Sequence, residues 1–447
     1  MSGFIILLGL FLVTGTVISL VVMRAKQSQE EYFIGGRKIG GLVSALTYSS
    51  TTYSAFMMVG LVGLAYTTGV GAMIFELAYL LGTIILLSTY GHRIWALGRE
   101  KGFISPMEIF SHRYGQAAGT LGTLISFLAL IPYTSVQVIG LGLILQTYGG
   151  FSFSAGVLMA AGIICLWAFI GGLRGVALTD AVQGVFMLGA ALVGVFWVGR
   201  TFTGFELQSF PNAFWTPARF INLTLPWFFF ALTNPQVLQR LFIPRDRGSL
   251  KRMIVLFGVF GLLYTLIVSF IGFAASYGSG VGLFPQVADR DRVILEVFAL
   301  MSRALALPLA LSIVFASVST ANSIILTLSS MFARDVVREE RRVWVGRLFI
   351  IGLTALIAVF SIRRPGYIVE LSVTSSSILL CFVPLLFGVF HMRRGGLMTG
   401  VLTCLAGAGT AIVLGLLRVP LSSVYTLLVS FAVFLLVSLV EKDRPPG

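Results

Sequence analysis

Long apolar runs separated by short polar stretches dominate the chain along its whole length. A hydrocarbon core of about 30 Å requires about 20 apolar residues in a helix. Thirteen runs satisfy this requirement, at 3–23, 41–66, 71–92, 116–146, 152–172, 178–200, 216–242, 252–276, 303–333, 343–362, 368–392, 396–417 and 421–440. The pattern predicts an all-α integral membrane protein of about 13 transmembrane helices, forming a single transmembrane domain over residues 1–447.

Composition agrees with this prediction, because 57% of the residues are hydrophobic and only 11% are charged, against about 25% charged residues in soluble domains. The net charge of +14 does not require a nucleic-acid partner. Most of the 31 Lys and Arg residues, Arg240 among them, follow odd-numbered runs. Because positive residues favour the cytoplasmic side, we expect a multi-pass cell-membrane protein with its N-terminus outside and its C-terminus in the cytoplasm.

The second run contains an unusual hydroxyl-rich segment at 47–54, with the sequence TYSSTTYS. Ser and Thr side chains can bond to their own helix, so the segment could be polar decoration where two helices meet. The alternative is a locally unwound helix, whose free carbonyl groups would bind a cation or a substrate within the membrane. The sequence leaves both interpretations open.

A second polar cluster lies in the ninth run, at 316–323. Ser319, Asn322 and Ser323 share one helix face through their i, i+3 and i+4 spacing, and Thr320 lies about 100° around the helix. Neutral carbonyl and hydroxyl oxygens suit a hard monovalent cation. This cluster is therefore a candidate cation site, with helix packing as the alternative.

Three carboxylates interrupt the apolar runs. Asp180 in the sixth run costs about 2.5–3.5 kcal/mol on insertion scales, so it should face a cavity, a cation or a partner, or else extend to the interface near Arg174. Of the two glutamates, Glu76 lies deeper in its run than Glu370 does. Glu76 is therefore the better candidate for substrate binding.

The seventh run contains Pro235, which removes a backbone donor and breaks the helix there. The aromatic residues at 227–230 either line a substrate cavity or simply pack. The three cysteines have no metal-binding spacing and are interpreted as small packing residues; they are Cys165, Cys381 and Cys404.

Four ordered motifs make the chain resemble the sodium/solute symporter family from about residue 4 to residue 395. They are EYFIGGR at 31–37, GGLRGVALTDAVQ at 171–183, PQVLQR at 235–240, and Ser319-Thr320 followed by Asp335. The resemblance implies the leucine-transporter fold, with inverted five-helix repeats at 41–200 and 216–392. It also implies an extra N-terminal helix at 3–23 and two C-terminal helices at 396–440.

The resemblance further implies functional residues. A sodium ion would be bound by Ser50, Tyr53, Ala316, Ser319 and Thr320. A second sodium would use Asp180, Asn322 and Ser323, although Asn322 departs from the family's serine, so we expect one ion with Asp180 close by. Substrate would contact Thr52, Ser54, Met57, Glu76, Trp227, Ala231 and Val369.

We therefore expect a sodium-coupled secondary active symporter that works by alternating access, acts as a monomer and is not an enzyme. Its solute should be small and carboxylate-bearing, such as an amino acid, a monocarboxylate or a pantothenate-like vitamin. Proton coupling through Asp180, sugar transport and a membrane sensor module are the alternatives. A membrane enzyme is disfavoured, since the sequence contains no His, Cys or carboxylate-pair constellation.

Overall fold

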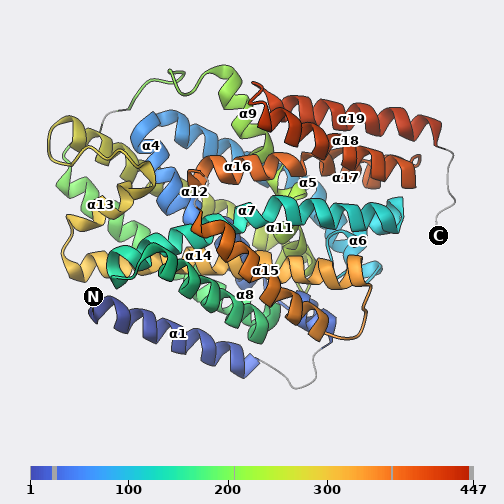
Figure 1. Cartoon of the computed structure of the whole chain (residues 1–447), viewed down its shortest axis with the longest axis horizontal. Helices are drawn as coiled ribbons and strands as arrows, with labels where there is room; N and C mark the ends of the chain where they lie inside the picture. Colours follow the sequence, from blue (N-terminus) through green and yellow to red (C-terminus); the bar gives the residue numbers. More distant parts are fainter. Residues whose placement is uncertain (1, 23–27, 206, 364–365, 442–447) are drawn as a thin grey trace.

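A computed structural model describes residues 2–22, 28–205, 207–363 and 366–441. Regular structure in these ranges is helical, apart from one isolated bridge between Ile39 and Pro244. The long helices are α1 (Ser2–Val22), α5 (Val70–Glu100), α7 (Gln116–Gly149), α8 (Phe153–Thr201), α12 (Arg247–Gly280), α14 (Arg303–Met331), α15 (Trp344–Ile362), α18 (Leu397–Leu416) and α19 (Ser422–Val440). Most of them run along one common direction, with α1 on one edge of the bundle and α18 and α19 on the opposite edge (Figure 1).

Shorter helices complete the bundle. They are α2 (Gln29–Ile34), α3 (Gly41–Thr52), α4 (Val62–Thr68), α6 (Glu108–Tyr114), α9 (Pro217–Phe228), α10 (Phe230–Thr233), α11 (Pro235–Gln239), α13 (Val293–Ala299), α16 (Ile368–Ile378) and α17 (Phe382–His391). The π-helical turns are η2 (Phe56–Leu61) and η5 (Phe332–Val337), and the 3-10 turns are η1 (Gly35–Arg37), η3 (Arg240–Phe242), η4 (Arg290–Arg292) and η6 (Leu379–Cys381). The apolar pattern did not predict α2, α6 or α13, because none of them is long enough to cross a bilayer.

Ten helices in the described ranges are long and apolar enough to span a membrane. This confirms the all-α membrane class, while the total of thirteen spans stays a prediction. The runs at 152–172 and 178–200 were expected to be separated by a loop, but both lie within α8. Gly172, at φ 53° and ψ −170°, alone interrupts that helix. The two predicted helices are therefore present, and a kink at one glycine, whose positive φ is unfavourable for other residues, replaces the predicted loop.

The first and second family-like motifs pack on each other at this turn. The Tyr32 hydroxyl donates to the carbonyl oxygens of Ala168 and Phe169, at 2.8 and 3.1 Å. A Cβ atom at Gly172 would lie 2.7 Å from the Tyr32 ring. Segments that are more than 130 residues apart in the sequence therefore fix the kink in α8 together.

Both predicted helix breaks are present. α3 ends at Thr52, and Tyr53 follows with φ −88° and ψ 87° before the chain re-enters a helix at η2. Side chains satisfy the freed donors, since Ala55 N–H donates to the Gln137 side chain and Phe56 N–H donates to Ser54 Oγ. The hydroxyl-rich segment is thus helical up to Thr52 and unwound at Tyr53 and Ser54, so the helix opens within it as the second interpretation predicted.

The second break lies between α10 and α11. Asn234 adopts an extended conformation with φ −89° and ψ 113°, and Pro235 begins α11. Proline is tolerated at a first helical position because the amide donor that it lacks would have no partner there. Pro235 therefore breaks the helix at the position that the sequence predicted.

Candidate functional site

Four oxygen atoms of the predicted sodium site converge where α3 meets α14. Ser319 Oγ lies 2.9 Å from the Ser50 carbonyl oxygen and 3.1 Å from the Ala316 carbonyl oxygen. Thr320 Oγ1 lies 2.9 Å from the same Ser50 oxygen. All of these residues are buried, so the cluster is a closed set of neutral oxygen ligands.

The break in α3 explains why the Ser50 carbonyl is available. In a continuous helix this oxygen would accept from the amide of Ser54, whereas here it accepts from two hydroxyl groups of α14. Tyr53, the fifth residue predicted for the site, forms the break itself and is fully buried. The arrangement suits a dehydrated sodium ion, since neutral carbonyl and hydroxyl oxygens converge without adding charge.

A close helix contact holds α3 in place beside α8. A Cβ atom at Gly184 would lie 2.6 Å from Ser50 Oγ. Ser50 Oγ donates to the Asp180 carbonyl oxygen at 2.9 Å. Glycine at position 184 thus lets the two helices approach closely enough to position Ser50.

The residues predicted for a second ion lie directly beside this cluster. Thr47 Oγ1 donates to Asp180 Oδ2 at 2.6 Å. Ser323 Oγ lies 2.8 Å from Thr51 Oγ1. Asn322 is also buried on α14, and its Oδ1 has no hydrogen-bond partner among the described residues. Asp180 thus faces hydroxyl groups inside the bundle rather than the interface near Arg174.

Arg240 corrects one sequence-based expectation. It was counted among loop residues after the seventh run, but its side chain is fully buried. Its Nη2 donates to Ser323 Oγ at 2.5 Å, and its charge interacts with that of Asp180. Position 240 lies near the end of the run at 216–242, and the charge of Arg240 suggested the loop that follows, because the sequence does not show that Asp180 and Ser323 lie beside it.

The predicted substrate residues Glu76 and Trp227 meet each other, with Trp227 Nε1 donating to Glu76 Oε2 at 3.3 Å. Five further aromatic rings lie around Trp227, with centroid distances of 5.0 Å to Phe56, 6.2 Å to Phe75, 6.1 Å to Tyr79, 6.4 Å to Tyr133 and 5.2 Å to Phe230. Sequence reasoning missed all five of these rings except Phe230, which lies in the aromatic segment at 227–230. These residues and Glu76 are called the aromatic box below.

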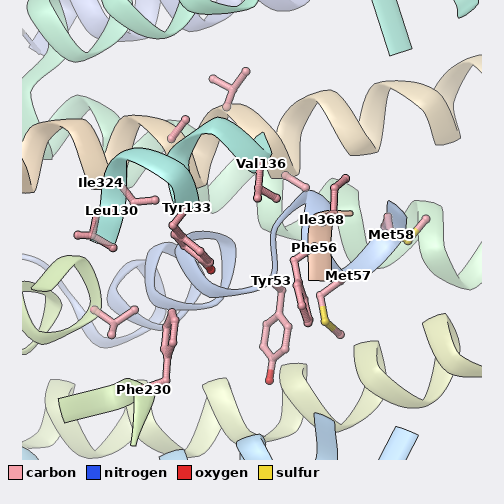
Figure 2. Packing of buried hydrophobic residues seen from close by; sticks show 14 of the residues in the cluster. Tyr53, Phe56, Met57, Met58, Leu130, Tyr133, Val136, Phe230, Ile324 and Ile368 are labelled. Atoms are coloured by element: carbon pink, nitrogen blue, oxygen red, sulfur yellow. The ribbon is translucent and has the colours of Figure 1, made fainter. Parts of the chain in front are cut away.

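Figure 2 shows part of the aromatic box, with Tyr53 and Phe56 extending in the same direction from the helix break. Tyr133 and Phe230 lie nearby, and their ring centroids are 6.1 Å apart (Figure 2). The broken helix therefore contributes both to the predicted sodium site and to the aromatic box. Its Ser50 carbonyl oxygen lies in the sodium site, and Phe56 belongs to the box.

The other predicted substrate residues are buried, with varied surroundings. Thr52 Oγ1 bonds to Tyr48 in its own helix, at 2.8 Å. Ser54 caps Phe56, as described above. Met57 is part of the buried cluster around the break, Ala231 lies in α10, and Val369 of α16 packs near Gly60. The structure thus brings together Glu76 and Trp227 most clearly.

Other acidic residues also form polar contacts, and two of them pair with arginine. Asp335 of the fourth motif accepts hydrogen bonds from Ser105 and from Thr123, the latter at 2.9 Å. Glu108 pairs with Arg334 at 2.7 Å. Glu370, the weaker glutamate candidate, pairs with Arg290. Glu370 therefore belongs to an ion pair outside the aromatic box.

The cysteines are free thiols, and Cys381 and Cys404 are buried. No group of three or more His, Cys, Asp or Glu residues that could hold a metal ion is present in the described ranges.

A model of the sodium:solute symporter family matches residues 32–403. The chain is 32% identical over 183 residues to the sodium/pantothenate symporter of Haemophilus influenzae, a match that covers 40% of this chain and 38% of that protein. It is 23% identical over 395 residues to the osmoregulated proline transporter OpuE of Bacillus subtilis, covering 82% and 79%. The match to the pantothenate symporter thus spans less than half of that relative's length.

Solved structures share the fold. A sodium-coupled sialic acid symporter, in a substrate-bound outward-open state, superposes with a TM-score of 0.81 over 98% of both chains at 16% identity. A nucleobase-cation-symport-1 family transporter gives a TM-score of 0.64 at 12% identity, covering 95% of this chain and 98% of that one. These matches confirm the expected fold, and the description of the family model agrees with the expected transport class and coupling ion. Because the family model covers most of the chain, this protein belongs to the sodium:solute symporter family.

Proposed function

We propose that the protein couples the inward movement of sodium to the transport of a small organic solute across the cell membrane by alternating access. The sodium ion binds to Ser50, Tyr53, Ala316, Ser319 and Thr320. The observation that carries this assignment is that two α14 hydroxyl groups converge on one carbonyl oxygen released by the break in α3. Hydroxyl and carbonyl oxygens of this kind are the ligands that sodium prefers.

The position of the proposed sodium site explains how ion binding would be coupled to the conformational change of alternating access. Its ligands come from α3, in the proposed first repeat at 41–200, and from α14, in the proposed second repeat at 216–392. An ion bridging the two elements favours whichever state brings their oxygens together. The broken α3 also contributes to the aromatic box, so sodium binding prepares the substrate site in the same state.

A single sodium ion accompanies each solute in this proposal. The place predicted for a second ion already contains a cation, because the guanidinium of Arg240 contacts Ser323 and interacts with Asp180. A second sodium there would lie close to a like charge, which is unfavourable in a low-dielectric interior. Asp180 instead helps to position the sodium cluster, since its carbonyl oxygen accepts from Ser50 Oγ.

The proposal retains the expected topology, with the N-terminus outside and the C-terminus in the cytoplasm, and one copy of the chain contains the complete pathway. The distribution of Lys and Arg along the chain supports this orientation.

Uptake into proteoliposomes tests the function directly. Amino acids, carboxylates, vitamins and sugars would be offered with a sodium gradient, a proton gradient or neither. We expect accumulation of at least one solute that requires the sodium gradient. Accumulation driven equally well by a proton gradient in the absence of sodium would contradict the proposal.

A further inference from the structure

Glu76 is a buried carboxylate without a counter-charge. It is 1% exposed, and its hydrogen bond within the described chain is the one from the Trp227 indole. The ion pairs among the described residues do not include Glu76. A charged side chain in this environment is costly unless a cation approaches it.

Two other deeply buried carboxylates, Asp180 and Asp335, have more polar partners than Glu76 has. Asp180 lies near Arg240, which donates to Ser323, and Asp335 accepts a hydrogen bond from Ser105 while the neighbouring Arg334 pairs with Glu108. Both also accept hydrogen bonds from threonine hydroxyl groups. Hydroxyl donors thus contact both of these carboxylates, whereas the hydrogen bond described for Glu76 comes from an indole N–H.

The surroundings of Glu76 are suited to one kind of cation. The faces of aromatic rings carry partial negative charge and attract ammonium groups, most strongly when the groups are desolvated. The aromatic box provides six rings, including Trp227 and two tyrosines, next to a single carboxylate. Sodium prefers a shell of several oxygens, as at Ser50 and Thr320, whereas an organic ammonium group is held by ring faces and one carboxylate.

We propose that the transported solute carries a cationic nitrogen, either a protonated amine or a quaternary ammonium group, which binds between Glu76 and the rings of the aromatic box. This inference rests on the proposed transport function and narrows its substrate class. Amino acids and betaines satisfy it, because their carboxylate can point away from Glu76. Simple monocarboxylates and pantothenate do not satisfy it, because a second anion beside Glu76 would be repelled.

Two pairs of probes that differ only at nitrogen would test the inference. Choline is matched with 3,3-dimethyl-1-butanol, its neutral carbon isostere, and proline is matched with tetrahydro-2-furoate, in which oxygen replaces the amine. Thermal stabilisation of the full-length purified protein in saturating sodium would report binding, and proteoliposome uptake would report transport. Probes would be used at up to about 10 mM, above the usual range of Michaelis constants.

We expect at least one cationic probe to bind about tenfold or more tightly than its isostere. Glu76→Gln should remove most of this preference, because the amide keeps the shape of the side chain and loses its charge. Trp227→Leu should weaken the cationic probe about five- to thirtyfold. Trp167→Leu is the matched control: Trp167 is equally buried and bonds to Thr16, but it lies between α8 and α1, so probe binding should not change.

Three results would overturn the inference. The first is failure of both cationic probes to bind, and the second is equal binding of probe and isostere. The third is a Glu76→Gln variant that changes the sodium response and keeps the preference among probes, which would make Glu76 an ion ligand. Loss of sodium dependence for every solute would instead contradict the proposed function, so the two failures are distinguishable.

Discussion

Removing the Thr320 hydroxyl should weaken sodium binding while leaving the fold intact. Thr320→Ala deletes one of the two hydroxyl groups that meet the Ser50 carbonyl oxygen at 2.9 Å, and Ser319 still contacts that oxygen. An interaction with a charged group contributes about 1.5–3 kcal/mol. We therefore expect the half-saturating sodium concentration to rise about 10- to 150-fold, since 1.4 kcal/mol corresponds to about one factor of ten.

Sodium-dependent thermal stabilisation measures this effect without knowledge of the solute, because a ligand that binds only the folded state stabilises it. Potassium chloride would keep the ionic strength constant, and sodium-dependent uptake would provide a second measurement. Thr320→Ser keeps the hydroxyl group and should remain close to the unmutated protein. Ser317→Ala is the matched control, since Ser317 is buried on the same helix and bonds to Ile313 of its own helix at 2.8 Å.

The reasoning would be refuted if the double variant Ser319→Ala/Thr320→Ala kept the sodium dependence of the unmutated protein. It would also be refuted if Ser317→Ala weakened sodium binding as much as Thr320→Ala did, because the effect would then come from general loosening of α14 rather than from lost ligands.

Three further predictions concern the neighbours of the proposed sodium site and the number of ions that it binds. Gly184→Ala places a Cβ atom 2.6 Å from Ser50 Oγ and should raise the half-saturating sodium concentration about fivefold or more, through a strain of about 1–3 kcal/mol. Gly189→Ala on the same helix meets open space and should leave sodium titrations unchanged. Equal effects of the two substitutions would contradict the proposed role of Gly184. Asp180→Asn should destabilise the protein by about 3–5 kcal/mol in thermal unfolding because it leaves Arg240 without its carboxylate, and adding Arg240→Gln should restore part of the loss. The unmutated protein should show a sodium Hill coefficient near one in uptake assays, and a value clearly above one would refute the single-ion proposal.

The sequence alone determined the fold class and the helix break at Pro235, and it marked 47–54 as a candidate for a second break. Hydrocarbon cannot satisfy free backbone groups, so long apolar runs must be helices, and hydroxyl-rich or proline-containing interruptions such as those at 47–54 and Pro235 indicate where a helix opens. Ser319 and Thr320 were predictable as a pair because adjacent residues on one helix stay close in any fold. The resemblance of ordered motifs added Ser50, Tyr53 and Ala316, and the structure brings their elements together.

Only the tertiary structure decided which charges meet which partners. The charge of Arg240 suggested a loop. Its burial near Asp180 depends on the path that the chain takes after Pro235, which only the folded protein shows. The rings of the aromatic box come from α5, α7, α9, α10 and η2, so no local pattern could have assembled them around Trp227 and Glu76. Whether a buried carboxylate has a counter-charge depends on contacts between helices that are distant in sequence. That is why Glu76 could be predicted as a substrate residue from the chain, while its lack of a basic partner could be seen only in the folded protein.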